Sequence, residues 1–373
     1  MLAAHSKDES SYSYDGDYRI IDIGAAGTSM RFLTAFFATK DGAKVIMTGS
    51  ERMRQRPISI LVDALRRLGA DIEYIGNEGF PPLRINGKRL QGGQLDIDGS
   101  VSSQYISALL MVGGALQNGL QLTLLGKVTS VPYIKMTLSM MEEFGVTSEW
   151  NGNVISVAPQ KYTATSYAVE SDWSAASYWY EILTLTRDIK SIRLKGLRLD
   201  STQGDWHIAD YFAELGIKTE RCDEGVVISR TECPLPEKVV WDMSSQPDLA
   251  QTVIASCCAL GVRFDITGLH TLRIKETDRI AALENELLKL GYDVKDSDDR
   301  RMYWDGSKIE ATASGNIASI KTYDDHRMAM AFAPLALITK SGYIDIENPH
   351  VVSKSYPSYW DDILSIGFTK TEH

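Results

Sequence analysis

The stretch RIKETDRIAALENELLKLG at residues 273–291 decides the fold, because its apolar tail recurs throughout the chain. The tail is a short amphipathic segment that ends in an apolar residue and a glycine. The other copies are LVDALRRLG ending at Gly69, LSMMEEFG at Gly145, ADYFAELG at Gly216 and WDDILSIG at Gly367. Successive copies lie 71 to 76 residues apart. This period exceeds the roughly 20–50 residues of solenoid repeats, so it predicts a larger, compact α/β unit that occurs five times.

A second apolar, helix-like stretch precedes each copy and opens with polar residues. These openings are Gly27-Thr28, Ser102-Ser103, Asp172-Trp173-Ser174, Pro247-Asp248 and Asp325-His326-Arg327. Their spacing follows the same period as the glycines. Repeated units that each point one helix start at the same place can build a single site, so we look for function at these openings.

The first unit shows the expected order of elements. Its residues predict a strand at 18–23, a helix at 30–39, a strand at 45–48, a loop at 49–56, a helix at 57–68 and strands at 72–75 and 83–85. We expect all five units to share this strand–helix–strand–helix–strand–strand order, which gives mixed α/β layers. The best domain boundary lies at residues 167–172, between two units.

Length and composition set the broad class. The chain of 373 residues favours two domains, and its 44% hydrophobic and 24% charged content is typical of a soluble globular protein. No apolar run reaches the ~18 residues of a membrane span, and a net charge of −10 argues against nucleic-acid binding. The cysteines have no metal-binding spacing, so buried free thiols are expected at Cys222, Cys233, Cys257 and Cys258.

Arg56 differs from its neighbours Arg52 and Arg54, which could equally well belong to a solvent-exposed face of the protein. It directly precedes Pro57, and proline at a first helical position predicts a helix start, where backbone N–H groups favour an anion. Gly24-Ala-Ala-Gly27 also follows a strand and opens a helix. The full dinucleotide fingerprint is absent, so an anion contact is favoured over nicotinamide binding.

Polar and charged groups at the other helix starts could have a purely structural role instead of a functional one. Asp248 can be a helix cap, Lys275 to Arg279 can be solvated pairs, and Ser102 to Gln104 can be capping groups. Together they place carboxylates, hydroxyls, an amide and cations at equivalent points of a repeat. This combination predicts a polyanionic ligand and acid–base chemistry with no metal and no cofactor.

Eight segments, in one order from about residue 21 to 360, carry a specific resemblance. They are AGTSMR (26–31), ERMRQRP (51–57), DGSVSSQ (98–104), PYI (132–134), PD (247–248), RIKETDR (273–279), DHRMAM (325–330) and SKSYP (353–357). On these segments the chain resembles the enolpyruvyl transferase family, and within it the 3-phosphoshikimate 1-carboxyvinyltransferases (EPSP synthases). The pair KETDR and DHRMAM is the most specific.

The resemblance implies a two-domain α/β fold, an inside-out α/β barrel of repeated βαβαββ units around bundles of parallel helices. The N-terminal domain would be residues 1–168, with about two repeats and a remnant, and the C-terminal domain residues 169–373, with three repeats and one N-terminal strand lacking. It also implies a monomer in the cytoplasm that acts on shikimate 3-phosphate and phosphoenolpyruvate in aromatic amino-acid biosynthesis.

The site residues follow from the matched segments. Shikimate 3-phosphate would be held by Ser102, Ser103, Gln104, Ser130, Tyr133, Asp248 and Lys275. Phosphoenolpyruvate would be held by Gly27, Arg56, Gln104, Arg279, Arg327 and Lys354. In the implied reaction the 5-hydroxyl attacks C2 of phosphoenolpyruvate, C3 gains a proton, and the intermediate expels phosphate. Asp248 would accept a proton and Glu276 would donate one.

The chain also departs from the family pattern. Ala25 and Thr271 replace two asparagines, which removes an amide contact at each place. The Ser-Lys-x-x-Ser-Asn-Arg motif that opens the family occurs nowhere, and Met1-Leu2-Ala3-Ala4 resembles the start of the second helix of the family's first unit. We therefore expect a sixth repeat to be encoded upstream, and residues 1–373 alone to turn over about three to five powers of ten more slowly.

Two other functions stay open at this point. A UDP-N-acetylglucosamine carboxyvinyltransferase would carry a catalytic cysteine near Arg52–Arg56, where this chain has none. A non-catalytic homologue that binds a phosphorylated ligand is the alternative from a different class.

Overall fold

The computed structural model describes residues 13–100, 102–298, 300–309 and 317–371. Residues 1–4, which were compared with a family helix, lie outside this part of the chain. The chain divides into two compact units, residues 1–166 and 167–373, close to the expected boundary after residue 168. Each unit is described by itself below.

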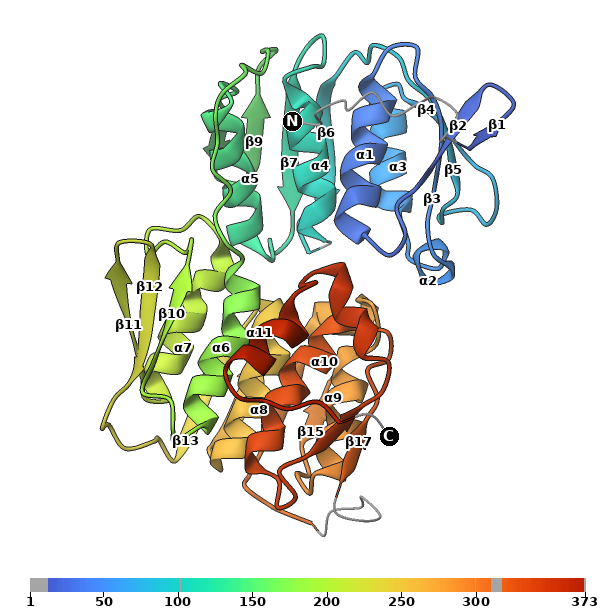
Figure 1. The fold of residues 1–373 in the computed structure, drawn as a ribbon. Coiled ribbons are helices and arrows are strands. Elements are labelled where there is room, and N and C mark those ends of the chain that lie inside the picture. The colour runs from blue at the N-terminus through green and yellow to red at the C-terminus, as the bar shows by residue number, and fades with distance from the viewer. Residues whose placement is uncertain (1–12, 101, 299, 310–316, 372–373) are drawn as a thin grey trace. The chain divides into compact units, whose positions relative to one another are not determined.

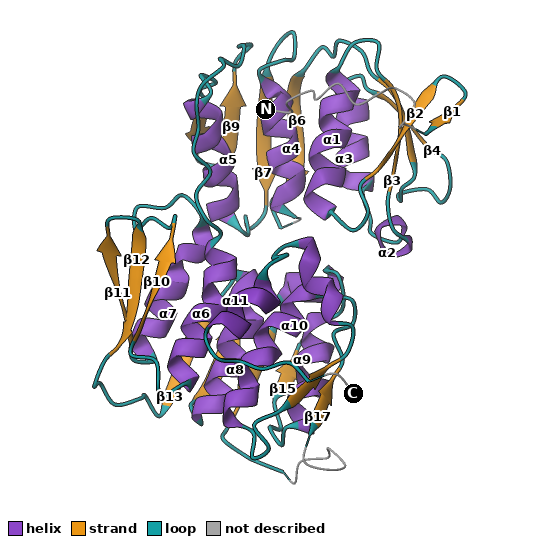
Figure 2. Ribbon diagram, in the orientation of Figure 1, coloured by secondary structure: helices purple, strands orange, loops and turns teal. Residues whose placement is uncertain are grey.

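Unit 1 contains two sheets with helices packed against them (Figures 1 and 2). The first sheet has the order β1-β2-β3-β5-β4, formed by Tyr14–Asp15, Tyr18–Asp22, Lys44–Thr48, Leu83–Asn86 and Asp71–Tyr74 respectively. Its helices are α1 (Gly27–Thr39), α2 (Glu51–Arg54) and α3 (Ser59–Arg67). The second sheet has the order β6-β7-β9-β8, formed by Gly93–Asp98, Leu120–Leu125, Val154–Val157 and Glu149–Asn151. Its helices are α4 (Ser103–Gly113) and α5 (Val131–Glu143).

Unit 2 contains three sheets. The first, β10-β12-β11, is formed by Ser191–Lys195, Gly225–Arg230 and Ile217–Cys222, with helices α6 (Trp173–Leu185), η2 (Gly204–His207) and α7 (Ile208–Glu214). The second, β13-β14-β16-β15, is formed by Lys238–Asp242, Arg263–Thr267, Arg301–Trp304 and Lys295–Ser297. Its helices are η3 (Pro247–Leu249), α8 (Ala250–Leu260), η4 (His270–Ile274) and α9 (Arg279–Lys289).

The third sheet of unit 2 has two strands, β17 (Ala318–Ile320) and β18 (Ile344–Ile346). The helices around it are α10 (His326–Phe332), η5 (Ala333–Ile338), η6 (Pro349–Lys354) and α11 (Tyr359–Ser365). In Figure 1, α6, α8 and α10 stand side by side, and α8 packs against both of the others.

One pairing rule runs through the sheets. In the three complete repeats the first strand pairs in parallel with the second, as β2 does with β3, β6 with β7 and β13 with β14. The second strand then pairs antiparallel with the last. A parallel neighbour requires a crossover, which the first helix of each repeat supplies, whereas the last two strands form a hairpin.

The expectation that all five units share one order of elements is wrong for two of them. Among the described residues, the unit that begins at α6 has no strand before its first helix, so β10 has no parallel neighbour. The last unit ends on α11, so within the described chain no hairpin follows it.

Aspartates fix the turns that lead from the first strands to the first helices. Asp22, Asp98 and Asp242 stand at the ends of β2, β6 and β13, and each accepts a backbone N–H from two residues further on, at 2.8 to 2.9 Å. Because a side chain that bonds its own backbone in this way stabilises a turn, the repeat begins each helix at an equivalent place.

The cores explain why the first helices are apolar on all sides. In α8 the residues from Ala250 to Cys258 are all buried, as expected for a helix enclosed by other elements. Cys257 and Cys258 are therefore the buried free thiols that the sequence predicted. Cys222 and Cys233 are also free, but the predicted burial is wrong for them, because Cys222 is half-buried at the end of β11 and Cys233 is exposed in the loop after β12.

Candidate functional site

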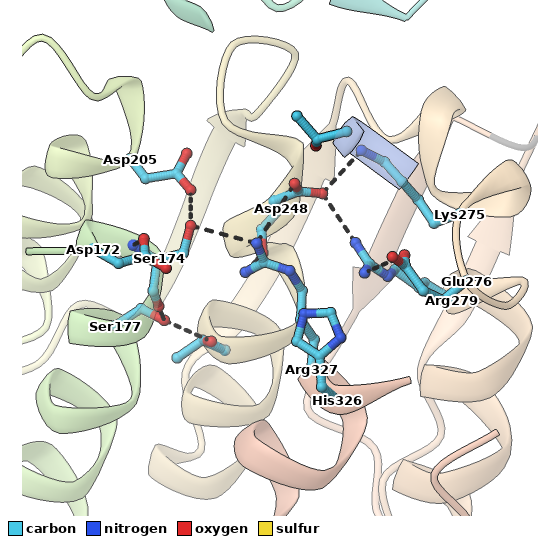
Figure 3. A network of polar contacts seen from close by, with 12 residues as sticks. Asp172, Ser174, Ser177, Asp205, Asp248, Lys275, Glu276, Arg279, His326 and Arg327 are labelled. Carbon is cyan, nitrogen blue, oxygen red and sulfur yellow. Dashed lines mark hydrogen bonds and ion pairs between the residues drawn. The ribbon is translucent and has the colours of Figure 1, made fainter. Parts of the chain in front are cut away.

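Asp248 is the centre of a polar network in unit 2 (Figure 3). Its Oδ1 lies 2.9 Å from Nη1 of Arg279 and 3.1 Å from Nζ of Lys275, and its Oδ2 lies 3.5 Å from Nη2 of Arg327. These cations come from the starts of α9 and α10 and from the end of η4. Asp248 itself lies in η3, where no side chain caps the following helix, so the capping alternative is wrong for this residue.

The surroundings of Asp248 hold it ionised. Burial by itself raises the pKa of a carboxyl, but the charges of Lys275, Arg327 and Arg279 outweigh it and hold the pKa of Asp248 well below its usual range. A carboxylate in this state is a weak base. It becomes a stronger base only when a ligand draws the cations away from it.

Arg279 connects three carboxylates and is almost fully buried. Its Nε donates to Asp325 at 2.6 Å, its Nη1 to Asp248 at 2.9 Å and its Nη2 to Glu276 at 2.9 Å. Asp325, which has no solvent exposure, also accepts the backbone N–H of Arg327 at 2.9 Å and so begins α10. The guanidinium is therefore fixed in direction by partners on three separate segments.

Glu276 binds cations through both oxygens. Oε2 accepts from Arg279, and Oε1 lies 2.7 Å from Nζ of Lys354 at the end of η6. The structure thus brings together Asp248, Lys275, Glu276, Arg279, Arg327 and Lys354, which are all the predicted site residues of unit 2. Sequence separation between the two ends of this cluster exceeds 100 residues, so only the fold brings them together.

Three residues that the sequence-based site set did not include join the network from the first repeat of unit 2. Nη2 of Arg327 lies 3.4 Å from the hydroxyl of Ser174, which in turn donates to Asp205. Asp172 caps α6 by accepting the N–H of Ser174 at 2.8 Å. The signal that could have found Asp172 and Ser174 is positional, because Asp172, Asp248 and Asp325 occupy the same place in successive repeats, whereas Asp205 lies in η2, away from these openings.

His326 is a poor candidate for proton transfer at neutral pH. Burial and the neighbouring positive charges of Arg327, Arg279 and Lys354 lower its pKa to about 4, although Asp325 opposes this. The ring is therefore neutral at pH 7.

Gly27 and Arg56 meet in unit 1, as the resemblance implied. A Cβ atom on Gly27 would lie 2.7 Å from Nη1 of Arg56 and 3.1 Å from Nη1 of Arg31, so the guanidinium groups rest against a residue without a side chain. Arg31 donates to the carbonyls of Gly27 at 3.1 Å and Pro57 at 3.2 Å. Sequence reasoning did not include this buried arginine in the site.

The helix start predicted at Pro57 is wrong in its details. Helix α3 begins at Ser59, and the predicted loop 49–56 contains the short helix α2, begun by Ser50, whose hydroxyl accepts the N–H of Met53. The carbonyl of Pro57 accepts from Arg31 and, at 2.6 Å, from the hydroxyl of Tyr105. Arg56 therefore lies against the start of α1 rather than at the start of the helix that follows it.

The predicted residues of the second repeat also gather at helix starts. Ser102 caps α4 by accepting the N–H of Gln104, and Ser103 is the first residue of that helix. The side-chain amide of Gln104 donates to the hydroxyl of Thr28 at 3.0 Å, which joins α4 to the residue that follows Gly27. The capping alternative is correct for Ser102. It does not account for the side-chain amide of Gln104, which bonds Thr28 and not the start of its own helix.

Ser130 begins α5 in a left-handed conformation with φ of 54°. Such a backbone is uncommon for a residue with a Cβ atom and is often found at functional sites. The side chain of Ser130 does not cap the helix, and Tyr133 lies one turn away, with its N–H donating to the carbonyl of Ser130 at 3.1 Å.

One departure from the family pattern leaves a mark in the structure. The hydroxyl of Thr271, in η4, is buried and has no hydrogen-bond partner, which is consistent with the loss of an amide contact there. Ala25 lies in the turn before α1.

Among the described residues, no group of three or more His, Cys, Asp or Glu side chains could hold a metal ion. No helix in the same ranges is long and apolar enough to cross a membrane.

Comparison with known proteins identifies the family of this chain. The family model of EPSP synthase (3-phosphoshikimate 1-carboxyvinyltransferase) matches residues 4–363. A 3-phosphoshikimate 1-carboxyvinyltransferase of Bacteroides fragilis is 52% identical over 350 residues, covering 94% of this chain and 83% of the relative. One of Mannheimia haemolytica is 37% identical over 353 residues, covering 91% and 78%.

Solved structures support the fold. An EPSP synthase of Acinetobacter baumannii superimposes with a TM-score of 0.71 at 23% identity, covering 94% of this chain and 79% of that one. The enolpyruvyl transferase NikO of Streptomyces tendae gives a TM-score of 0.59 at 14% identity, covering 82% and 70%. The predicted α/β enolpyruvyl-transferase fold is confirmed, and the chain belongs to the EPSP synthase family.

Proposed function

We propose that this protein is a 3-phosphoshikimate 1-carboxyvinyltransferase. It transfers the carboxyvinyl group of phosphoenolpyruvate to the 5-hydroxyl of shikimate 3-phosphate and releases phosphate. The observation that carries the proposal is the network around Asp248, where four cations and three carboxylates from separate segments of unit 2 converge. Such a cluster suits a substrate that carries several negative charges and a reaction that moves protons.

The cations of unit 2 are the proposed binding groups for phosphoenolpyruvate. Arg279, Arg327 and Lys354 are each held by a carboxylate, so their positions are fixed before the substrate arrives. Preorganised cations stabilise the phosphate as it leaves because they need little rearrangement during the reaction. In unit 1, the proposed binding groups for phosphoenolpyruvate are Gly27, Arg56 and Gln104.

Shikimate 3-phosphate is proposed to bind Ser102, Ser103, Gln104, Ser130 and Tyr133 of unit 1, together with Asp248 and Lys275 of unit 2. Hydroxyls and an amide at helix starts suit this ligand, since the N–H groups and the positive end of the helix dipole attract its phosphate. Asp248 is the group suited to accept the proton of the 5-hydroxyl.

The reaction has two stages. In the first, the 5-oxygen forms a bond to C2 of phosphoenolpyruvate, Asp248 takes the hydroxyl proton, and Glu276, after taking up a proton from solvent, gives a proton to C3. In the second, the bond from C2 to the phosphate oxygen breaks, Asp248 gives its proton to the leaving phosphate, and Glu276 takes a proton from C3 as the double bond reforms. Both carboxyl groups are thereby returned to their starting states.

Substrate binding is proposed to make Asp248 a better base. Three cations hold the pKa of Asp248 well below its usual range, and a bound trianion would share those cations. The pH profile tests this step, because kcat/KM reports the free enzyme and kcat reports the complex. We expect the acid limb of kcat to lie at a higher pH than that of kcat/KM. Identical acid limbs would contradict the step.

The sharpest test of the reaction uses heavy water. Because C3 becomes a methyl group before it loses a proton, the product should carry deuterium at C3 when the reaction is run in D2O, as seen by proton NMR and mass spectrometry. Product without deuterium would exclude this two-stage path. A chain that binds shikimate 3-phosphate in a thermal-shift assay and forms no product over a long incubation would favour the non-catalytic alternative.

A monomeric state and a cytoplasmic location are further expectations. Size-exclusion chromatography with light scattering checks the first, and cell fractionation checks the second.

A further inference from the structure

The loop that presents Asp325 and Arg327 has a costly backbone conformation. It joins β17 to α10, and its two successive residues Tyr323 and Asp324 have φ values of 54° and 57°. Residues with a Cβ atom rarely adopt this left-handed region, and they remain there only where the surroundings hold them. Contacts with neighbouring segments must therefore hold the loop in this conformation.

Helix α9 braces the loop at two places. At its first residue, Arg279 donates to Asp325 at 2.6 Å. Seven residues later, and so two turns along the same face, Glu286 accepts the hydroxyl of Tyr323 at 2.7 Å and the backbone N–H of Lys321 at 3.0 Å. One rigid element thus sets the position of both ends of the loop.

Glu286 is completely buried and well satisfied. Besides the two loop contacts it lies 2.6 Å from Nζ of Lys289, which itself donates to the carbonyl of Ser319 at 3.0 Å. Burial and the bond to Glu286 raise the pKa of Tyr323 to about 12, so its hydroxyl keeps its proton and donates at neutral pH. None of the described contacts of Glu286 reaches the Asp248 network.

A second brace holds the other side of the loop. The side-chain amide of Asn348 donates to Asp324 at 2.8 Å, and Asn348 also has a left-handed backbone, with φ of 50°. This contact secures Asp324 but leaves the position of Tyr323 to Glu286.

We propose that Glu286 is a positioning residue for the reaction, which acts through Tyr323 and the backbone of Lys321 to keep Asp325 and Arg327 in place beside Arg279. The inference rests on the proposed role of Arg279 and Arg327 in binding phosphoenolpyruvate. It goes further because it assigns a function to a buried carboxylate that touches neither substrate.

The test compares Tyr323→Phe and Glu286→Gln with the control Glu284→Gln. Tyr323→Phe removes one hydroxyl and keeps the ring, so it should fold even if the Glu286 variant does not. Glu284 lies on the same helix and accepts a backbone N–H, that of Asp296, at 2.8 Å, away from the loop. It is therefore matched in residue type, helix and kind of bond.

Phosphoenolpyruvate affinity is measured by calorimetry without shikimate 3-phosphate, so that no turnover occurs during the titration. If the competent loop becomes a minority state, the apparent affinity falls in proportion to its population, and we expect a loss of about tenfold for Tyr323→Phe. Affinity for shikimate 3-phosphate and both affinities of Glu284→Gln should stay within about twofold of wild type. An equal loss in Glu284→Gln, or a fall in melting temperature alone, would overturn the inference.

Hydrogen exchange of residues 325–328 gives a readout that needs no ligand. The amide of Arg327 is held by Asp325, so a displaced loop should expose it and speed its exchange about tenfold in Tyr323→Phe. Unchanged exchange overturns the inference. If wild type itself fails to bind phosphoenolpyruvate, the proposed function fails, while the exchange result still decides whether Glu286 positions the loop.

Discussion

The candidate site residues of the two units differ in charge and in the partners that hold them. In unit 2 the cations Lys275, Arg279, Arg327 and Lys354 are matched by the carboxylates Asp248, Glu276 and Asp325. In unit 1 the described site residues are mostly uncharged, and Arg31 is bound by the carbonyls of Gly27 and Pro57 rather than by carboxylates.

This difference indicates a division of labour. A network of opposite charges holds its members rigidly, but a ligand must compete with carboxylates that already occupy the cations. Hydroxyls and N–H groups at helix starts bind with less energy and need no displacement. We infer that unit 2 provides the proton chemistry and the charge stabilisation, and that unit 1 mainly orients the substrates.

The largest expected effect is on turnover when Asp248 is changed to Asn in an active chain. Asparagine keeps the size and much of the hydrogen bonding but cannot take a proton. Turnover should fall by about 10²–10⁴-fold while shikimate 3-phosphate still binds. Near-normal turnover in a phosphate-release assay would show that Asp248 only holds the cations in place. Glu276→Gln gives the matching test for the proton donor.

The next effect compares one arginine from each unit. Arg279→Gln leaves the buried Asp325 without its main cation, and breaking a buried ion pair costs about 3–5 kcal/mol, so the unfolding free energy of unit 2 should fall by that much. Arg56→Gln should cost about 1 kcal/mol or less. Urea denaturation followed by circular dichroism measures both. Equal losses would remove the contrast between the units.

Glu181 in α6 provides a test outside the site. It is fully buried, both of its oxygens lack a hydrogen-bond partner, and burial raises its pKa well above the usual value. A carboxyl with a raised folded pKa loses its contribution as pH rises above the unfolded value. Glu181→Leu should therefore stabilise unit 2 by about 1–3 kcal/mol, and by more at pH 8 than at pH 5. A gain that is independent of pH would show that the carboxyl titrates normally.

Gly27→Ala is the most local change and tests unit 1. The new Cβ atom would lie 2.7 Å from Nη1 of Arg56, which can move because it is the end of a flexible side chain. The fold should survive, and affinity for phosphoenolpyruvate should fall about tenfold through the displaced guanidinium. A parallel loss of affinity for shikimate 3-phosphate would indicate a wider disturbance of the α1 start instead.

Sequence patterns predicted most of the elements and the candidate site. The helices and strands of the first repeat follow from apolar periodicity, and the strand predicted at 45–48 lies within β3 (Lys44–Thr48). The short α2 was missed because one turn of helix leaves no period to detect. The order of elements was wrong at α6 and at the end of the chain, since a shared period does not require that every repeat be complete.

Sequence patterns also predicted only part of the candidate site. Asp248, Glu276 and their cations were found because they lie in the segments that resemble the family. Glu286 and Arg31 were not, because a charged residue within an amphipathic or apolar helix reads as part of a solvated face. Only the fold reveals that these two side chains are buried and that each holds a backbone segment of the site.

Phosphate release measured with both substrates, and with each alone, tests the central claim most directly. The account predicts release only when shikimate 3-phosphate and phosphoenolpyruvate are present together, and its loss in Asp248→Asn. Long incubation and product detection by mass spectrometry extend the measurement to slow turnover. Phosphate release that does not require shikimate 3-phosphate, or that Asp248→Asn leaves unchanged, would contradict the account.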